Sequence, residues 1–213
     1  SSGLFRNGTY DDTTPKFAIT HALNDDVNIY ASYTQGFRSG SFDARARTID
    51  SFLNSQPGPE EVTSIELGLK STLNDGRVMF NIAVFQADYD DIQKLALEDC
   101  VVDTTTCPSG RIQRLINAAE ATIEGIEIET RINITDQFSI EGSLGYTDAS
   151  FDKFEGFDAD GVPGYDPVTD PAAAKSLKFE RVPELTYNIM ANYYYPLESG
   201  AELAFRVSYS YTD

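Results

Sequence analysis

The stretch from Val62 to Gln93 constrains this chain most, because its side chains alternate strictly between apolar and polar. Successive side chains of a β-strand point to opposite faces, so a period of two predicts strands. Asn74-Asp75-Gly76 lies between two such runs, and these residue types accept the positive φ angles of a tight hairpin turn. The apolar positions are Ile65, Leu67, Leu69, Leu73, Val78, Phe80, Ile82 and Val84. We therefore expect a β-hairpin with one apolar and one polar face.

The same alternation recurs along the rest of the chain and predicts about eight strands in all. Short turns are expected at 24–26, 74–76, 135–137 and 197–200, and long polar connections at 36–61, 96–110 and 152–183. Short and long connections thus alternate, which is the pattern of an antiparallel up-and-down meander. Each apolar run covers about nine residues, close to the length that a tilted strand needs to cross a bilayer. The fold prediction is an all-β membrane barrel wall formed by residues 1–213 as a single domain.

Composition excludes several classes of function. The 213 residues carry a net charge of −18, which argues against a nucleic-acid partner, whose phosphates require Lys and Arg, and against an anionic membrane surface. The run Tyr193-Tyr194-Tyr195 is therefore interpreted as part of an aromatic girdle at a membrane interface rather than as a base-stacking platform. No apolar run reaches the ~18 residues of a membrane-spanning helix.

Four segments resemble the barrel of TonB-dependent outer-membrane receptors. They are YASYTQGFRSGSF (30–42), PEEVTSIELGLKSTLNDGRVMFNIAVFQADYDDIQ (59–93), NAAEATIEGIEIE (117–129) and RVPELTYNIMANYYYPL (181–197). The most specific of these are the opening PEEVTSIELGLKS, the ending YDDIQ, and NAAEATIEGIEIE. The likeness covers nearly the whole chain.

The resemblance implies a barrel of roughly 22 strands in the Gram-negative outer membrane, with the long loops extracellular. The substrate would be a scarce nutrient, with a ferric siderophore favoured over cobalamin or an oligosaccharide. The partners would be an N-terminal plug domain, the remaining barrel strands, outer-membrane lipid and the TonB complex. The chain lacks a TonB box, a plug and a terminal aromatic strand end, so we expect an internal part of the barrel.

Two groups of polar residues are candidates for function within such a barrel. Upper strand ends and loops are expected to face a ligand, through Gln35, Arg38, Asp88, Asp90, Asp91, Gln93 and Asn117. The polar face of the strands is expected to form a hydrated lumen wall that contacts the plug, through Glu66, Lys70, Glu127, Glu129, Arg131 and Glu141.

The cysteines, the acidic loop and the histidine suggest no catalytic set and no metal site. Cys100 and Cys107 are expected to form a disulfide, because an exported protein meets an oxidising compartment. The lone His21 disfavours a metal centre, and we expect neither a cofactor nor an enzyme activity. The acidic loop carries Asp158, Asp160, Asp166 and Asp170. Its spacing lacks the third acid and the closing Glu of an EF-hand calcium loop. A solvated, flexible loop is therefore favoured over a weak cation contact.

Two rival interpretations remain from the sequence. One is a complete eight-stranded outer-membrane barrel of structural or adhesive function. The other is a soluble extracellular β-sandwich that binds a ligand, in which the apolar faces of two sheets would pack together.

Overall fold

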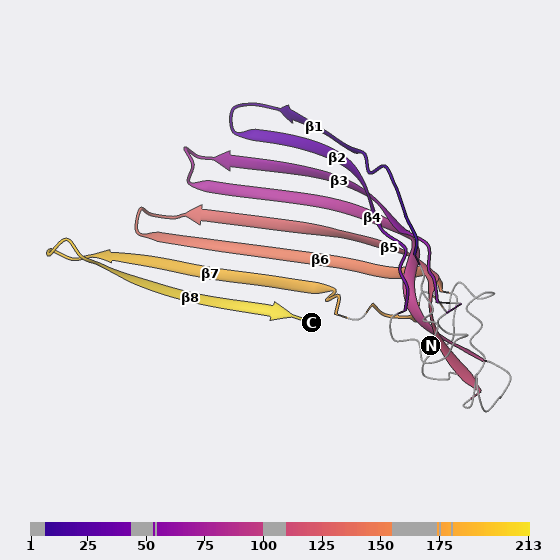
Figure 1. Ribbon diagram of the computed structural model, residues 1–213. Helices are drawn as coiled ribbons and strands as arrows, with labels where there is room; N and C mark the ends of the chain where they lie inside the picture. Colours follow the sequence, from indigo (N-terminus) through magenta and orange to yellow (C-terminus); the bar gives the residue numbers. More distant parts are fainter. Residues whose placement is uncertain are drawn as a thin grey trace.

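The chain folds into one antiparallel sheet of eight strands in sequence order, as the alternation predicts. The computed structural model describes residues 7–43, 53, 55–99, 110–154, 174, 176–179 and 181–213. Figure 1 shows the strands side by side in a single curved layer, with the short turns at one end and the strand ends that lead into the long connections at the other. The strands are β1 (Lys16–Ala22), β2 (Val27–Arg38), β3 (Glu60–Leu73), β4 (Val78–Asp99), β5 (Arg111–Asn133), β6 (Phe138–Phe154), β7 (Leu185–Pro196) and β8 (Glu202–Thr212).

The strand register sorts the side chains into two continuous faces. Directly paired residues share a face, so a row of partners can be followed from strand to strand. One row is apolar and contains Ile29, Leu69, Ile82, Ile128, Leu144, Tyr187 and Tyr211. The next row, on the opposite face, is polar and contains Asn28, Lys70, Asn81, Glu129, Ser143, Asn188 and Ser210. The hairpin pattern predicted for residues 62–93 therefore extends over the sheet.

The apolar face is uncovered. Phe17, Ile19 and Val207 are 66%, 70% and 73% exposed, and no second sheet packs on them among the described residues. This arrangement contradicts the sandwich interpretation. The complete small barrel is also wrong, because β1 and β8 each pair on only one side within the described sheet and do not close it. An apolar surface of this extent marks a site of membrane or protein contact.

No helix among the described residues has the length and hydrophobicity to cross a membrane.

The four short turns lie where the sequence predicts them. Asn74, Asp75 and Gly76 adopt φ angles of 55°, 54° and 83°, and the Arg77 N–H donates to the Asn74 carbonyl at 3.1 Å. In the β1–β2 turn the Asn24 side chain accepts a hydrogen bond of 2.9 Å from the Asp26 N–H. Side chains that stabilise their own turn in this way fix the register of each hairpin.

The strands extend further toward the long connections than predicted. The expected loops 36–61, 96–110 and 152–183 begin too early, since β2 ends at Arg38, β4 at Asp99 and β6 at Phe154. The start of β5 at Arg111 agrees with the predicted end of the loop 96–110. Register shifts interrupt the β4–β5 pairing between Tyr89 and Gln93. These bulges break the alternation of side chains while the backbone pairing continues, so the sequence pattern ends before the strand does.

Candidate functional site: the polar face and the loop end

All six charged residues predicted for the lumen wall lie on the polar face. Arg131 is the register partner of Glu141, and Lys70 is linked to Glu129 through their shared partner Asn81. Glu127 lies in the row of Gly68 and Ala83 on the same face. Glu66 lies two residues before Gly68 on β3 and therefore shares this face. Their shared face is thus a finding, whereas their contact with a plug remains a prediction. The face carries charges of both signs, and Arg206 on β8 adds a further cation to Lys70 and Arg131.

A polar network crosses four strands of this face, from β5 to β8. Arg131 donates to Glu141 at 3.3 Å, and the Asn192 amide contacts the other Glu141 oxygen at 3.4 Å. The Arg206 Nε–H in turn donates to the Asn192 Oδ1 at 2.9 Å. Asn192 is only 4% exposed, so this amide links the Arg131–Glu141 ion pair to Arg206 from a buried position. Asn192 and Arg206 were not among the predicted site residues, although both follow the polar parity of their strands.

Tyr30 forms the centre of a second polar group, between β2 and β3. Its hydroxyl donates to Glu66 at 2.6 Å, and the Lys70 ammonium lies 5.5 Å from its ring centroid. A hollow of about 180 Å³ lies beside it, lined in part by Asn81, Glu127 and Glu129. Fixed carboxylates and amides around a hollow hold water and polar groups, which suits the wall of a hydrated passage.

The seven residues predicted to face a ligand fall into different places. Gln35, Asp88 and Asp90 follow the parity of Ile65, so they lie on the loop-side continuation of the apolar face. There Asp88 accepts hydrogen bonds from Thr122 at 3.2 Å and from Gln86 at 3.0 Å. No single cluster brings the seven together among the described residues, and contact with a ligand remains a prediction for each.

Arg38 and Asp91 lie near the connection between β2 and β3. Arg38 has the polar parity and is 3.7 Å from Glu60. Asp91 occupies the bulge of β4 with a φ angle of 55°, a conformation that few non-glycine residues adopt. Its carbonyl accepts a hydrogen bond of 2.6 Å from the Asn117 amide.

Gln93 and Asn117 are paired across β4 and β5 and bind the backbone of the β2–β3 connection. The Gln93 Nε2 donates to the carbonyls of Ser39 and Gly58 at 2.9 and 3.1 Å. The Asn117 Oδ1 accepts from the Gly58 N–H at 2.7 Å, and its Nδ2 donates to the Pro59 carbonyl at 3.3 Å. Gln93 is 6% exposed, so its side chain is buried against the β2–β3 connection.

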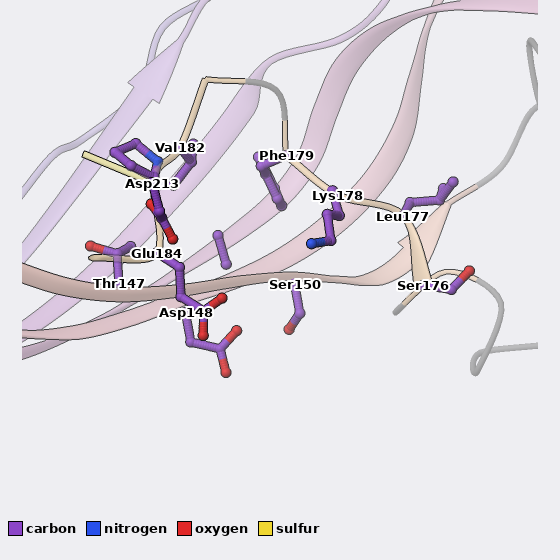
Figure 2. Close-up of a pocket in the computed structure, with 12 residues that line it drawn as sticks. Thr147, Asp148, Ser150, Ser176, Leu177, Lys178, Phe179, Val182, Glu184 and Asp213 are labelled. Carbon is purple, nitrogen blue, oxygen red and sulfur yellow. The ribbon is translucent and has the colours of Figure 1, made fainter. Parts of the chain in front are cut away.

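A larger hollow of about 560 Å³ opens where β6 continues past the start of β7 (Figure 2). Its lining is mixed, with Asp148, Ser150 and Glu184 beside Lys178 and Phe179. The hollow has polar and apolar walls and is open to solvent.

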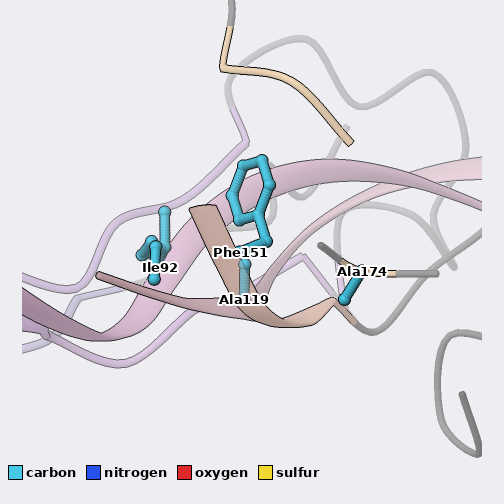
Figure 3. Close-up of a cluster of buried hydrophobic side chains, with 5 residues drawn as sticks. Ile92, Ala119, Phe151 and Ala174 are labelled. Carbon is cyan, nitrogen blue, oxygen red and sulfur yellow. The ribbon is translucent and has the colours of Figure 1, made fainter. Parts of the chain in front are cut away.

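A small hydrophobic cluster lies at the same end of the sheet (Figure 3). Phe151 and its partner Ala121 have the polar-face parity, and Phe151 is 4% exposed. The Phe179 ring stacks on Phe151 with centroids 4.1 Å apart, and the Lys94 ammonium lies 5.3 Å from the Phe151 centroid. This packing holds residues 176–179 against the sheet.

Some predicted features lie outside the described residues: the Cys100–Cys107 disulfide and the acids Asp158, Asp160, Asp166 and Asp170. In the described parts of the chain no group of three or more His, Cys, Asp or Glu is placed to hold a metal ion.

Comparisons with known proteins agree with this geometry. A metal-pseudopaline receptor, CntO of Pseudomonas aeruginosa, is 24% identical over 160 residues, which are 73% of this chain and 20% of the receptor. The ferric yersiniabactin uptake receptor FyuA from Yersinia pestis superposes with a TM-score of 0.62 at 16% identity, over 92% of this chain and 25% of that one. The siderophore receptor PiuA from Acinetobacter baumannii gives a TM-score of 0.58 at 19% identity, over 91% of this chain and 28% of that one.

The chain spans about a fifth of the length of the curated relative it matches. The family model described as "TonB dependent receptor-like, beta-barrel" covers residues 2–213. The apolar face of the eight strands is then part of the outer surface of a larger barrel. The chain therefore belongs to the TonB-dependent receptors of the outer membrane, as a part of their β-barrel.

Proposed function

We propose that this chain forms part of the barrel wall of a receptor that imports a metal chelate, with a ferric siderophore as the substrate. The observation that carries the proposal is the sheet itself, in which an apolar face and a polar face run without interruption across neighbouring strands. Such a sheet suits lipid on one side and a wet passage on the other. Three relatives support the substrate class by name: a metal-pseudopaline, a ferric yersiniabactin and a siderophore receptor.

In this proposal the polar face lines the interior of a barrel of roughly 22 strands and contacts a plug domain. Glu66, Lys70, Glu127, Glu129, Arg131 and Glu141 would present charges of both signs to that plug. Because a mixed-charge wall attracts no single sign of ligand strongly, we assign it to plug contact and hydration rather than to substrate selection. Transport would draw its energy from the inner membrane through TonB.

The long connections would face the cell exterior and carry the selectivity for the chelate. Loops held on a rigid scaffold commonly supply binding residues. The end of the sheet that bears Gln93, Asn117 and Phe151 would then be the extracellular mouth, and the end with the short turns would face the periplasm.

The test is uptake by the full-length receptor in cells from which its gene has been deleted. Radiolabelled ferric hydroxamate, catecholate and carboxylate siderophores would be supplied separately, with and without TonB. We expect one class to enter only when both the receptor gene and TonB are present. Uptake of cobalamin or an oligosaccharide instead would replace the substrate assignment, and uptake that ignores TonB would refute the transport proposal.

A further inference from the structure

Two amide side chains at the loop end position the connection between β2 and β3. Gln93 and Asn117 are direct partners across β4 and β5, just beyond the bulged part of that pairing. The connection begins after Arg38 and ends before Glu60, so its two stems leave and re-enter adjacent strands. Both amides reach toward these stems, although they lie more than thirty residues further along the chain.

Their hydrogen bonds join the beginning of the connection to its end. Gln93 donates to Ser39 in the first stem and to Gly58 in the second, at 2.9 and 3.1 Å. Its Oε1 accepts from the Ser41 hydroxyl at 2.9 Å, and its backbone N–H donates to the Glu60 carboxylate at 2.9 Å. Both amide atoms of Gln93 are therefore engaged, and the side chain lies buried between the stems.

Asn117 secures the second stem from the neighbouring strand. Its Oδ1 accepts from the Gly58 N–H at 2.7 Å, and its Nδ2 donates to the carbonyls of Gly58, Pro59 and Asp91 at 3.2, 3.3 and 2.6 Å. The stems also bond to each other, with Ser41 N–H donating to Pro57 and Asp43 N–H to Ser55 at 3.3 and 3.4 Å. Buried backbone groups without such partners would be costly, so the two amides determine where the stems 39–43 and 55–59 lie.

We infer that Gln93 and Asn117 are positioning residues for ligand recognition, and that they act by fixing the two described stems of the β2–β3 connection, residues 39–43 and 55–59. The inference rests on the proposed function, because it assigns these two stems to recognition of the metal chelate. A carboxylate in place of either amide would keep the size and one acceptor but lose the Nε2 or Nδ2 donors. These variants therefore distinguish a role of the amide donors in positioning from a role of the side chains in filling space.

The experiment compares Gln93→Glu, Asn117→Asp and Gln93→Ala in the full-length receptor, with Gln86→Ala as the control. Gln86 lies on the same strand, is exposed, and its amide bonds only to Asp88 at 3.0 and 3.2 Å among the described residues. Uptake is measured against the concentration of the radiolabelled ferric siderophore class that the wild-type receptor imports. We expect the half-saturating concentration to rise about tenfold in the three variants, with a maximal rate close to wild type. The Gln86→Ala variant should resemble wild type in both values.

Hydrogen exchange of the same purified receptors provides the second readout. Amide protection of residues 39–43 and 55–59 should fall in the three variants, while the peptides of β7 and β8 keep theirs. Unchanged half-saturation despite lost protection would overturn the inference, and so would unchanged protection. If the wild-type receptor imports none of the siderophore classes, the proposed function fails instead, and the two failures are thus distinguishable.

Discussion

The ring of Tyr30 occupies the space directly above Gly68, its register partner on the neighbouring strand. A Cβ atom at position 68 would collide with that ring. The glycine therefore lets the aromatic side chain lie across β3, where its hydroxyl reaches Glu66 at 2.6 Å. Aromatic cover of a glycine on the adjacent strand is a known way to stabilise β-sheets.

Replacement of Gly68 by alanine should displace the Tyr30 ring and break its hydrogen bond to Glu66. We expect a loss of about 1–2 kcal/mol in unfolding free energy. Thermal unfolding of the purified full-length receptor, followed by its heat-dependent gel mobility, measures this loss. The matched control is Gly142→Ala, where a Cβ would meet only ordinary contacts at 3.5 and 3.6 Å. Equal stability of the two variants would contradict the role of Tyr30.

Ile82 and Ala83 are neighbours on β4 that lie on opposite faces of the sheet. Ile82→Arg would place a charge in lipid near the middle of the apolar rows, at a cost of ~2–4 kcal/mol. Ala83→Arg would place the same charge on the polar face beside its partner Glu127, at a cost below ~1 kcal/mol. Urea unfolding of the receptor refolded into lipid vesicles compares them. Similar costs for the two arginines would mean that the faces do not differ in environment.

Asn192 and Asn188 test the polar network on β7. Both have the polar parity, but Asn192 is buried and links Glu141 to Arg206, whereas Asn188 bonds to Ser210 at 2.8 Å near the edge of the described sheet. Asn192→Ala should cost about 0.5–1.5 kcal/mol, because it removes the buried amide that bonds to both Glu141 and Arg206. Asn188→Ala should cost about 0.5 kcal/mol or less. A smaller cost at position 192 than at 188, read from the same unfolding curves, would refute the network.

Phe179 holds residues 176–179 on the sheet through its stack with Phe151. Phe179→Ala should remove the ring contact, which is worth ~0.5–1.5 kcal/mol beyond the buried area, and also one of the two rings near Lys94. Hydrogen exchange should then accelerate in residues 176–179 and remain slow in β4 and β5. Phe154→Ala serves as the comparison, because this ring contacts Phe151 edge-on from within β6 itself. Faster exchange throughout the sheet would show that Phe179 stabilises more than this segment.

Local patterns predicted the parts of the fold that depend on near neighbours. The alternation around Leu69 and Ile128 gave the faces, and Asn74-Asp75-Gly76 gave a turn, because each depends on adjacent residues alone. The end of β4 at Asp99 was missed, since bulges near Asp91 disturb the alternation where the pairing continues. The apolar patterns do reveal that a sheet exists, but not where it ends.

The candidate site was less predictable because its contacts join distant parts of the chain. Tyr30 meets Gly68 across the long β2–β3 connection, and no short turn fixes the register between these two strands. Gln93 and Asn117 were recognised as notable polar residues at strand ends, yet their partners Ser39 and Gly58 were not. Polarity identifies which residues need a partner, whereas only the fold identifies the partner.

Site-directed spin labelling along β5 tests most directly which face of the sheet meets lipid. Single cysteines at residues 126–132 of the full-length receptor, in a background without Cys100 and Cys107, would carry nitroxides in lipid vesicles. We predict that labels at Ile126, Ile128, Thr130 and Ile132 collide mainly with oxygen, and those at Glu127, Glu129 and Arg131 mainly with a water-soluble relaxation agent. A profile without a two-residue period, or with the opposite phase, would contradict the assignment of the apolar face to lipid.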